Sequence, residues 1–581
     1  MRWSPHGTAA RKSLAASEAA YRRARLRSVV VSALFATAFA ALGVRAFWVQ
    51  CINDGFYQFQ GDKRQVADFT LHASRGRILD RNGRLLAVSL PTKTLWIDAR
   101  DVDQPSPARL RPLAALLGIG AGHIERIYSE HRAFAYLQRQ VSLPVAQAAL
   151  HLGVPGLFAD SDFRRFYPEG QLAAHVTGFV GVDGNGQEGI ERADDHPLMG
   201  IDGTRRVVRT ARGAIIDTLS QVAPTPGTDI RLSIDRRIQF AAFQALRAAV
   251  LQTGAQAGSA IVLDAHTGEI LAMTNWPTFD PNHRTSRTGV QIRNRAVTDV
   301  FEPGSVLKPL TIALALERHV VTPDTLVPTN GGQLHLDRAV IHDDADFGTL
   351  TVSQVIQKSS NVGTTKIALQ LSPQDMWKNF RAVGLGRVPA SGLPGAASGN
   401  VRPYSHWRRI EQATMSYGYG LSASLLQLAQ IYTVFANEGV FVPATIQLRR
   451  TAPAPAHRIY RKRVATQVRA MLETVVSKGG TAPQAAVSGY TVAGKTGTAY
   501  RWTENGYDRR QYRSSFIGIV PARSPRVIVA VSIDRPTKGS HFGGAVSGPV
   551  FANVAGRAMQ ILNVVPDRPL GAPAPEGPPA T

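Results

Sequence analysis

The chain of 581 residues is long enough for two or three domains, and its 44% hydrophobic content excludes a mainly disordered protein. A single cysteine, Cys51, excludes an intramolecular disulfide framework and any cysteine-rich zinc or iron–sulfur site. The 66 basic residues exceed the 42 acidic ones and give a formal net charge of +24. They form no dense run beyond the N-terminus, so the charge does not indicate a nucleic-acid partner.

The N-terminus joins a basic segment to an apolar one. Residues 1–27 carry seven basic side chains against one acidic side chain, a net charge of +6, and residues 28–49 are mostly apolar. About 17 to 21 residues can cross a hydrocarbon core roughly 30 Å thick. We therefore predict a cytoplasmic tail over residues 1–27 and a transmembrane anchor over residues 28–49, because the basic side stays inside. A cleaved signal peptide is the alternative, but the apolar run exceeds the usual length of about 7 to 15 residues.

The exported part divides into three regions. Residues 50–222 contain the glycine-rich segments 181–189 and 200–208, which are typical of turns between strands, and we predict an elongated, β-rich, non-catalytic domain. Residues 223–565 contain the apolar runs 259–265, 514–520 and 526–534, which predict an antiparallel sheet flanked by helices, an α+β fold. The Pro-rich residues 566–581 are predicted to be disordered.

The segment "EPGSVLKPL", residues 302–310, places Ser305 and Lys308 three residues apart. On a helix this spacing brings the two side chains to one face, so the amine can reach the hydroxyl. Pro303 and Gly304 break the chain just before, and an apolar run follows. We expect Ser305 at a helix N-terminus, whose N–H groups suit a developing oxyanion.

Two further motifs follow in order. Ser359-Ser360-Asn361 lies 54 residues after Ser305 (359 − 305), and Lys495-Thr496-Gly497-Thr498 begins 136 residues after Ser359 (495 − 359). Each motif is weak alone. Together they match the set of serine acyl-transferases that attack D-alanyl peptides and β-lactams.

The third motif also fits a phosphate-binding loop, because "GYTVAGKTGT", residues 489–498, matches G-x-x-x-x-G-K-S/T. Such a loop needs a buried strand before it and a helix after it. Residues 477–488 contain two glycines and a proline, and Gly497 falls in the would-be first helical turn. The acyl-transferase interpretation is therefore preferred.

Longer segments extend the similarity. Together with the three motifs, they resemble the class B penicillin-binding proteins, most closely the septal peptidoglycan D,D-transpeptidases of the penicillin-binding protein 3 type, and the resemblance covers roughly residues 20 to 560. The segments are "RGRILDRNGRLLA" (75–87), "RRFYPEGQLAAHVTGFVGVDGNGQEGIE" (164–191), "PTPGTDIRLSIDRRIQ" (224–239) and "FGGAVSGPVF" (542–551).

This resemblance implies a fold and a reaction. Residues 50–222 would form a dimerisation-type pedestal, and residues 223–565 a transpeptidase domain of the penicillin-binding/serine β-lactamase-like fold. Ser305 would form an acyl-enzyme with a stem peptide, releasing the terminal D-Ala before an amine takes the acyl group. Lys308 would be the base, since burial and the charge of Lys495 lower an amine pKa.

The other motif residues receive roles from the same resemblance. Ser359 would relay a proton, and Asn361 would hold the substrate amide. The terminal carboxylate would be bound by Lys495, Thr496, Gly497 and Thr498. The backbone N–H groups of Ser305 and Thr498 would form the oxyanion hole.

No cofactor or metal is expected. The acidic segment "HDDAD", residues 342–346, lacks a spaced second histidine and is predicted to be a solvated loop. Gly418 and Gly420 are predicted to shape a turn before a helix over residues 424–437.

The resemblance also implies a place and partners. The protein would sit in the bacterial inner membrane at the division septum, with its catalytic domain in the periplasm. Its partners would be stem peptides, a polytopic glycosyltransferase and bitopic activators of division, with β-lactams as inhibitors. Two other functions stay open: a D,D-carboxypeptidase or β-lactamase-like hydrolase using the same acyl-enzyme, and a division scaffold with a vestigial site.

Overall fold

The computed structural model describes residues 9–52, 66–100, 102–209, 215–449, 456–504 and 506–569. Contacts within the chain define two compact units. The first comprises residues 1–71, 94–160 and 202–224, and the second comprises residues 72–93, 161–201 and 225–581. Residues 1–8 of the predicted tail, and all but the first four residues of the predicted Pro-rich C-terminus, lie outside the described residues.

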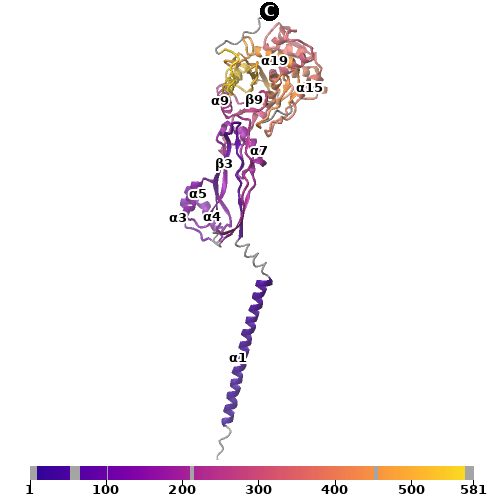
Figure 1. Cartoon of the computed structure of the whole chain (residues 1–581). Helices are drawn as coiled ribbons and strands as arrows, with labels where there is room; N and C mark the ends of the chain where they lie inside the picture. The colour runs from indigo at the N-terminus through magenta and orange to yellow at the C-terminus, as the bar shows by residue number, and fades with distance from the viewer. Residues whose placement is uncertain are drawn as a thin grey trace, which may run out of the picture. The chain divides into compact units, whose positions relative to one another are not determined.

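The first unit begins with a long helix, α1 (Ala9–Phe47), which continues into one π-helical turn, η1 (Trp48–Ile52) (Figure 1). Residues 20–52 are long and apolar enough to cross a membrane by length and composition, and the chain buries none of this span. The predicted anchor of residues 28–49 falls inside it. An unburied apolar helix of this length is what a hydrocarbon core accommodates.

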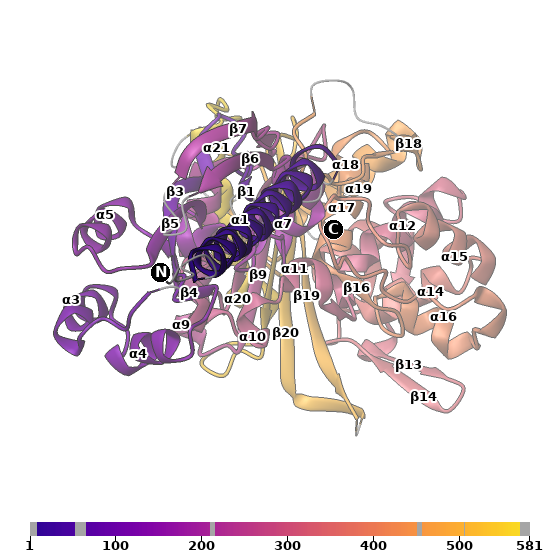
Figure 2. The same cartoon turned by 90° about the horizontal axis from the view of Figure 1, so that it is seen from below.

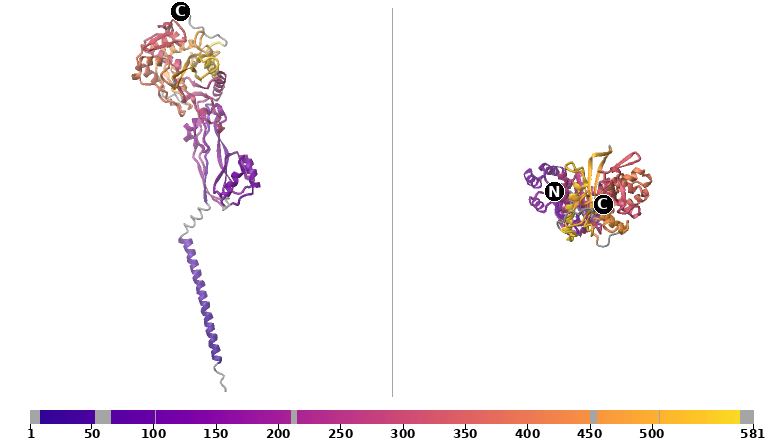
Figure 3. Two further views of the ribbon diagram at one scale, coloured as in Figure 1. Left: turned by 180° about the vertical axis from the view of Figure 1, so that it is seen from behind. Right: turned by 90° about the horizontal axis from the view of Figure 1, so that it is seen from above.

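The rest of the first unit holds a sheet and a small helical core. In the sheet, β6 (Gly203–Arg209) pairs antiparallel with both β1 (Val66–Leu71) and β7 (Ile215–Val222). Leu95, Leu113 and Tyr128 belong to the helical core and are buried, so this part has an apolar interior of its own. Its elements are α3 (Pro107–Leu117), α4 (Ala121–Ser129), β4 (Ala135–Val141), α5 (Leu143–His151) and the adjoining ends of β3 (Leu85–Ile97) and β5 (Leu157–Phe166) (Figure 3).

The second unit is built on a five-stranded antiparallel sheet of order β10-β9-β21-β20-β19. Every residue of β9 and β21 is buried, as expected for strands covered on both faces. The three apolar runs that the sequence predicts as strands lie in β9, β20 and β21, so the predicted α+β sheet is confirmed. The strands are β9 (Ala257–Asp264), β10 (Ile270–Trp276), β19 (Ala493–Thr503), β20 (Gly506–Val520) and β21 (Val527–Asp534).

Helices cover this sheet. The long helices α9 (Arg236–Thr253) and α21 (Gly548–Ile561) pack against each other and against the strands. Figure 2 shows a second group on the side of β19 away from α9. This group contains α12 (Lys308–Glu317), α14 (Asn361–Ala368), α15 (Pro373–Ala382) and α16 (Arg409–Ser416). Strand β19 is an edge strand and therefore faces the second group with unpaired backbone groups.

The remaining elements are short. Strand β2 (Ile78–Leu79) pairs with β3 and with β8 (Ile230–Arg231). The others are α6 (Ala174–Thr177), α7 (Gly189–Ala193), α8 (Asp195–Met199), α10 (Gly289–Ile292), α11 (Arg295–Thr298), β11 (Val300–Phe301), β12 (Leu326–Pro328), β13 (Gln333–Leu336), β14 (Ala339–His342), β15 (Thr349–Thr351), α13 (Val352–Lys358), β16 (Ala423–Ser424), α17 (Leu425–Ile431), α18 (Thr433–Ala436), β17 (Val440–Phe441), β18 (His457–Arg458), α19 (Lys462–Thr474) and α20 (Gly543–Val546).

A buried ion network joins two of the family-like segments within the second unit. The carboxylate of Glu191, which is fully buried, accepts from Arg75 Nε at 2.5 Å and from Arg165 Nε at 2.6 Å. Asp195 accepts from Arg75 Nη1 at 2.7 Å. A buried charge is stable only when it is paired and hydrogen-bonded, so these residues depend on one another.

Candidate active site

Ser305 lies in a single 3₁₀ turn, η4 (Gly304–Leu307), and α12 begins only at Lys308. The sequence predicted that an α-helix begins at Ser305, and the structure places its start one turn later, at Lys308. The reason is Pro309, which has no N–H for the Ser305 carbonyl. The N–H of Lys308 donates to that carbonyl instead, and this closes the tighter 3₁₀ ring.

The three motifs converge on the hydroxyl of Ser359. Lys308 Nζ donates to Ser359 Oγ at 3.1 Å and also to the Ser359 carbonyl oxygen. Lys495 Nζ donates to the same Oγ at 2.9 Å. Lys308 and Lys495, which lie 51 and 136 positions from Ser359 in the chain, thus donate to the same hydroxyl oxygen.

Both amines are completely buried, and this changes their protonation. Burial lowers the pKa of Lys308 to about 7, with partial opposition from the charges of Asp343 and Asp344. Burial, and then the positive charge of Lys308, lower the pKa of Lys495 well below its usual value. A neutral amine is therefore accessible near neutral pH, and the two lysines titrate as a coupled pair.

The backbone of Ser359 is held in an unusual conformation. Its φ is +60°, in the left-handed region, where it ends α13. A non-glycine residue there costs about 1 kcal/mol or more and is found mainly where structure or function requires it. Ser360 follows at once as the N-cap of α14, and its Oγ accepts from the Gly363 N–H at 2.8 Å.

Asp343 has a structural role that the sequence analysis did not predict. Its carboxylate accepts from Ser360 Oγ at 2.6 Å and from the N–H groups of Asn361 and Val362 at the start of α14. The expectation of a solvated loop over residues 342–346 is therefore wrong for this residue, which is partly buried. A carboxylate at a helix N-terminus is favourable, and here it fixes the Ser-x-Asn motif.

The third motif lies in edge strand β19. Thr496 Oγ1 shares a hydrogen bond of 2.9 Å with Thr481 Oγ1, and Thr498 Oγ1 accepts from the Gly543 N–H at 3.0 Å. A Cβ on Gly497 would stand 3.0 Å from the Pro303 carbonyl oxygen, so glycine lets the strand approach η4. Lys495 occupies a strand interior, which excludes the phosphate-loop alternative, because that loop requires a helix to begin there.

Gly418 supports the same turn from the other side. Its carbonyl accepts from the Gly304 N–H at 3.0 Å, its φ is +88°, and a Cβ there would stand 2.2 Å from the Gly304 carbonyl oxygen. The sequence predicted only a turn before a helix. The structure adds backbone contact with the residue preceding Ser305, and the helix over 424–437 is divided into α17 and α18.

A polar cavity of about 830 Å³ lies along β19 at Ala499, Tyr500 and Arg501, the residues that follow the third motif. It is lined in part by Glu302, Gly420, Tyr500 and Tyr507. Glu302 Oε1 accepts from the Gly420 N–H at 2.7 Å and from the Tyr507 hydroxyl at 2.9 Å. Its Oε2 is buried with no hydrogen-bond partner among the described residues, and burial raises the pKa of this carboxyl.

The side chains gathered here are of the kinds that acyl transfer through a serine requires. They comprise a serine in a tight turn, two buried amines with lowered pKa and a hydroxyl to which both amines donate. No group of three or more metal-ligating side chains occurs in the part of the chain that the structure describes.

Comparisons with known proteins identify the family of the chain. The family model of the penicillin binding protein transpeptidase domain matches residues 258–556, and that of the penicillin-binding protein dimerisation domain matches residues 70–232. A relative in Neisseria meningitidis, the probable peptidoglycan D,D-transpeptidase PenA, is 40% identical over 544 residues, which cover 93% of each chain. The peptidoglycan D,D-transpeptidase FtsI of Escherichia coli is 36% identical over 536 residues, 91% of each chain.

A solved structure shows the same fold. The transpeptidase domain of Burkholderia pseudomallei penicillin-binding protein 3 is 52% identical, with a TM-score of 0.54, and the match covers 58% of this chain and 98% of that one. The transpeptidase family model itself spans more than half of the sequence. The chain therefore belongs to the penicillin-binding protein transpeptidase family.

Proposed function

We propose that the protein is a peptidoglycan D,D-transpeptidase that cross-links stem peptides at the division septum through an acyl-enzyme on Ser305. The observation that carries this proposal is the meeting of Lys308, Ser359 and Lys495 beside the turn that holds Ser305. Relatives that are named D,D-transpeptidases, and that align with more than nine-tenths of the chain, support this class of reaction.

The first half-reaction forms the acyl-enzyme. Ser305 Oγ attacks the carbonyl carbon of the penultimate D-Ala, and the neutral amine of Lys308 takes the hydroxyl proton. The tetrahedral oxyanion is held by the backbone N–H groups of Ser305 and Thr498, at about 3 kcal/mol per donor. When the C–N bond breaks, the departing D-Ala nitrogen receives a proton through the Ser359 hydroxyl.

The second half-reaction returns the enzyme. An amine of a neighbouring stem attacks the ester carbonyl, Lys308 takes a proton from that amine, and the C–O bond to Ser305 breaks. Ser305 regains its proton, and a new amide bond links the two stems. Water in place of the amine would give the hydrolase that is the alternative function.

Edge strand β19 provides the substrate surface. A peptide can add to its unpaired edge as an extra strand. Lys495, Thr496, Gly497 and Thr498 would bind the terminal carboxylate, whose negative charge would raise the pKa of the Lys495 amine and favour its protonated form. Asn361 would hold the amide on the opposite side, because α14 presents it at the first helical position.

The location and partners belong to the same proposal. A single span over residues 28–49, with residues 1–27 inside, would place the pedestal of residues 50–222 and the catalytic domain of residues 223–565 in the periplasm. The exposed apolar helix and the similarity to FtsI support this arrangement. The division glycosyltransferase and bitopic activators would then be its partners. The prediction of disorder over residues 566–581 does not hold at its start, because Asp567 accepts from the Thr491 N–H at 2.7 Å and the Arg568 N–H donates to the Gly489 carbonyl at 3.2 Å.

Intact mass spectrometry after incubation with a penicillin tests the proposal. The wild-type chain should gain the mass of one penicillin and hold it for many minutes. Ser305→Ala should gain none, whereas the control Ser353→Ala, a helix α13 serine outside the motifs, should gain the full adduct. An adduct that persists in Ser305→Ala would refute the assignment, and rapid loss from the wild type would favour the hydrolase.

A further inference from the structure

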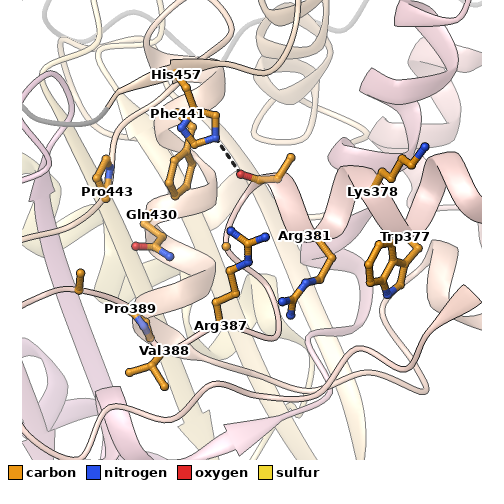
Figure 4. Close-up of a pocket in the computed structure, with 13 residues that line it drawn as sticks. Trp377, Lys378, Arg381, Arg387, Val388, Pro389, Gln430, Phe441, Pro443 and His457 are labelled. Atoms are coloured by element: carbon orange, nitrogen blue, oxygen red, sulfur yellow. Dashed lines mark hydrogen bonds between the residues drawn. The ribbon is translucent and has the colours of Figure 1, made fainter.

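A second cavity, of about 450 Å³, opens in the second unit and shares no residue with the three motifs (Figure 4). Helix α15 forms one wall, and α17, β17 and β18 contribute the others. Five separate stretches of chain meet there, so the cavity is a feature of the folded domain and not of one loop. Its lining includes Trp377, Lys378, Arg381, Arg387, Phe441 and His457.

The lining is positively charged. It contains Lys378, Arg381, Arg387 and a histidine, and no aspartate or glutamate. Lys378 and Arg387 are exposed and form no ion pair with the described acidic residues. Arginines elsewhere on this surface are paired: Arg318 lies 2.7 Å from Asp375, at the other end of α15. The cavity thus keeps cationic groups uncompensated.

The same cavity has flat apolar walls. The ring of Trp377 lies 5.9 Å from the guanidinium carbon of Arg381, and the rings of Phe441 and His457 are 5.4 Å apart. Arg381 Nη1 donates to the Gly386 carbonyl at 2.6 Å, which fixes its guanidinium at the cavity. Figure 4 draws Arg381 and Arg387 among the lining residues, between the labelled Trp377 and Gln430 in that view.

One buried donor is left unused. The indole Nε1 of Trp377 is buried and has no hydrogen-bond partner among the residues that the structure covers. Because this N–H has almost no accessible surface, Trp377 offers a ligand in the cavity its ring and not its N–H. The neighbouring His457, in contrast, shares a hydrogen bond of 3.1 Å with the Ala382 carbonyl, drawn as the dashed line in Figure 4.

We propose that this cavity binds a small organic anion, a carboxylate, phosphate or sulfonate group carried on a flat apolar body. Arginine and lysine side chains give charge-assisted hydrogen bonds to such a group, and the aromatic walls accept the body. The volume lies within the range of about 300 to 1,000 Å³ that small-molecule sites occupy. Arg381 and Arg387 hold the anion, Lys378 adds positive charge at the edge of the cavity, and the ring of Trp377 packs against the flat body.

The cavity is separate from the three motifs, because none of their residues lines it. Its side of α15 differs from the side facing α12, where Asn379 donates to the Leu310 carbonyl at 3.2 Å and accepts from the Tyr460 hydroxyl at 2.6 Å. The ligand should therefore bind both the free enzyme and the enzyme acylated by penicillin.

Titration calorimetry of the full chain in detergent tests this proposal, with phenyl phosphate as the probe. We expect one site per chain, and at least about tenfold weaker binding of inorganic phosphate and of phenol, which each carry half of the recognised chemistry. The double variant Lys378→Ala/Arg387→Ala should lose about tenfold or more in affinity, since charged hydrogen bonds are lost. Trp377→Phe keeps the charges of Lys378 and Arg387 but offers the flat body of the ligand a smaller ring, so it should also weaken binding.

The matched control is Arg557→Ala, an exposed arginine of α21 outside the cavity, which should bind phenyl phosphate like the wild type. Covalent labelling by penicillin shows that each variant is folded. The proposal is overturned if phenyl phosphate does not bind, if the double variant binds it unchanged, or if acylation by penicillin blocks it. It is also overturned if only an acidic peptide with an aromatic residue binds, because the site would then be a protein docking surface.

Discussion

Replacing Lys308 by arginine keeps the positive charge and removes the proton acceptor. Burial lowers the pKa of Lys308 to about 7, so a neutral amine is accessible to the wild-type enzyme near neutral pH. An arginine, with a pKa above about 12, is neutral in fewer than roughly one molecule in 10⁵ at that pH. A positioned general base contributes about 10²- to 10⁴-fold to a rate, and we expect Lys308→Arg to slow acylation by that factor.

The assay is the second-order rate of acylation by a fluorescent penicillin, measured from pH 5.5 to 9. The wild-type rate should rise about tenfold per pH unit below pH 7 and level off above it, because the reactive form is the neutral amine. Lys308→Arg should show no such rise. Lys462→Arg is the control, since Lys462 is exposed and paired with Glu438 at 2.7 Å. Acylation of Lys308→Arg within about threefold of the wild type would refute the reasoning.

The structure supports three other predictions. Gly418→Ala should slow acylation by more than tenfold and lower the melting temperature, because the added Cβ would collide with the Gly304 carbonyl. Gly420→Ala is the control: its φ is also positive, but no atom lies within 3.6 Å of the added Cβ. It should lower the free energy of unfolding in urea by only about 1 kcal/mol. Glu191→Ala should destabilise the second unit by about 3 to 5 kcal/mol, because the buried Arg165 loses its counter-ion and Arg75 keeps only Asp195. Asp229→Asn breaks the exposed pair with Arg77 and should shift the urea midpoint far less. Because the pKa of Lys308 is lowered in the folded protein, the unfolded chain binds more protons than the folded one between pH 7 and about pH 10. The melting temperature should therefore rise with pH over this interval, and Lys308→Met should flatten that rise.

The central sheet could be predicted from the sequence because its strands are continuous apolar runs. Residues 259–265, 514–520 and 526–534 need no long-range information to be identified, and burial on both faces explains their composition. The three motifs could be found because their residue types and order are specific. The site roles and the domain boundaries stay predictions.

Other features depend on contacts that one sequence does not reveal. Asp343 was placed in a solvated loop because nothing local shows that α14 begins beside it in space. The contact between Gly418 and Gly304 joins residues 114 positions apart (418 − 304), so the glycine indicated a turn but not its neighbour. The 3₁₀ turn at Ser305 follows from Pro309, because its missing N–H leaves the Ser305 carbonyl to the N–H of Lys308 and moves the start of α12 to that residue.

The measurement that tests the central claim most directly is the partition of the acyl-enzyme. The full chain is incubated with a D-alanyl peptide thioester and increasing concentrations of a D-amino acid, and both products are quantified. Acylation of Ser305 followed by transfer to an amine predicts that the amide product replaces the acid while the total consumption of donor stays constant. Consumption that yields only the acid at every amine concentration, or that continues in Ser305→Ala, would contradict the account.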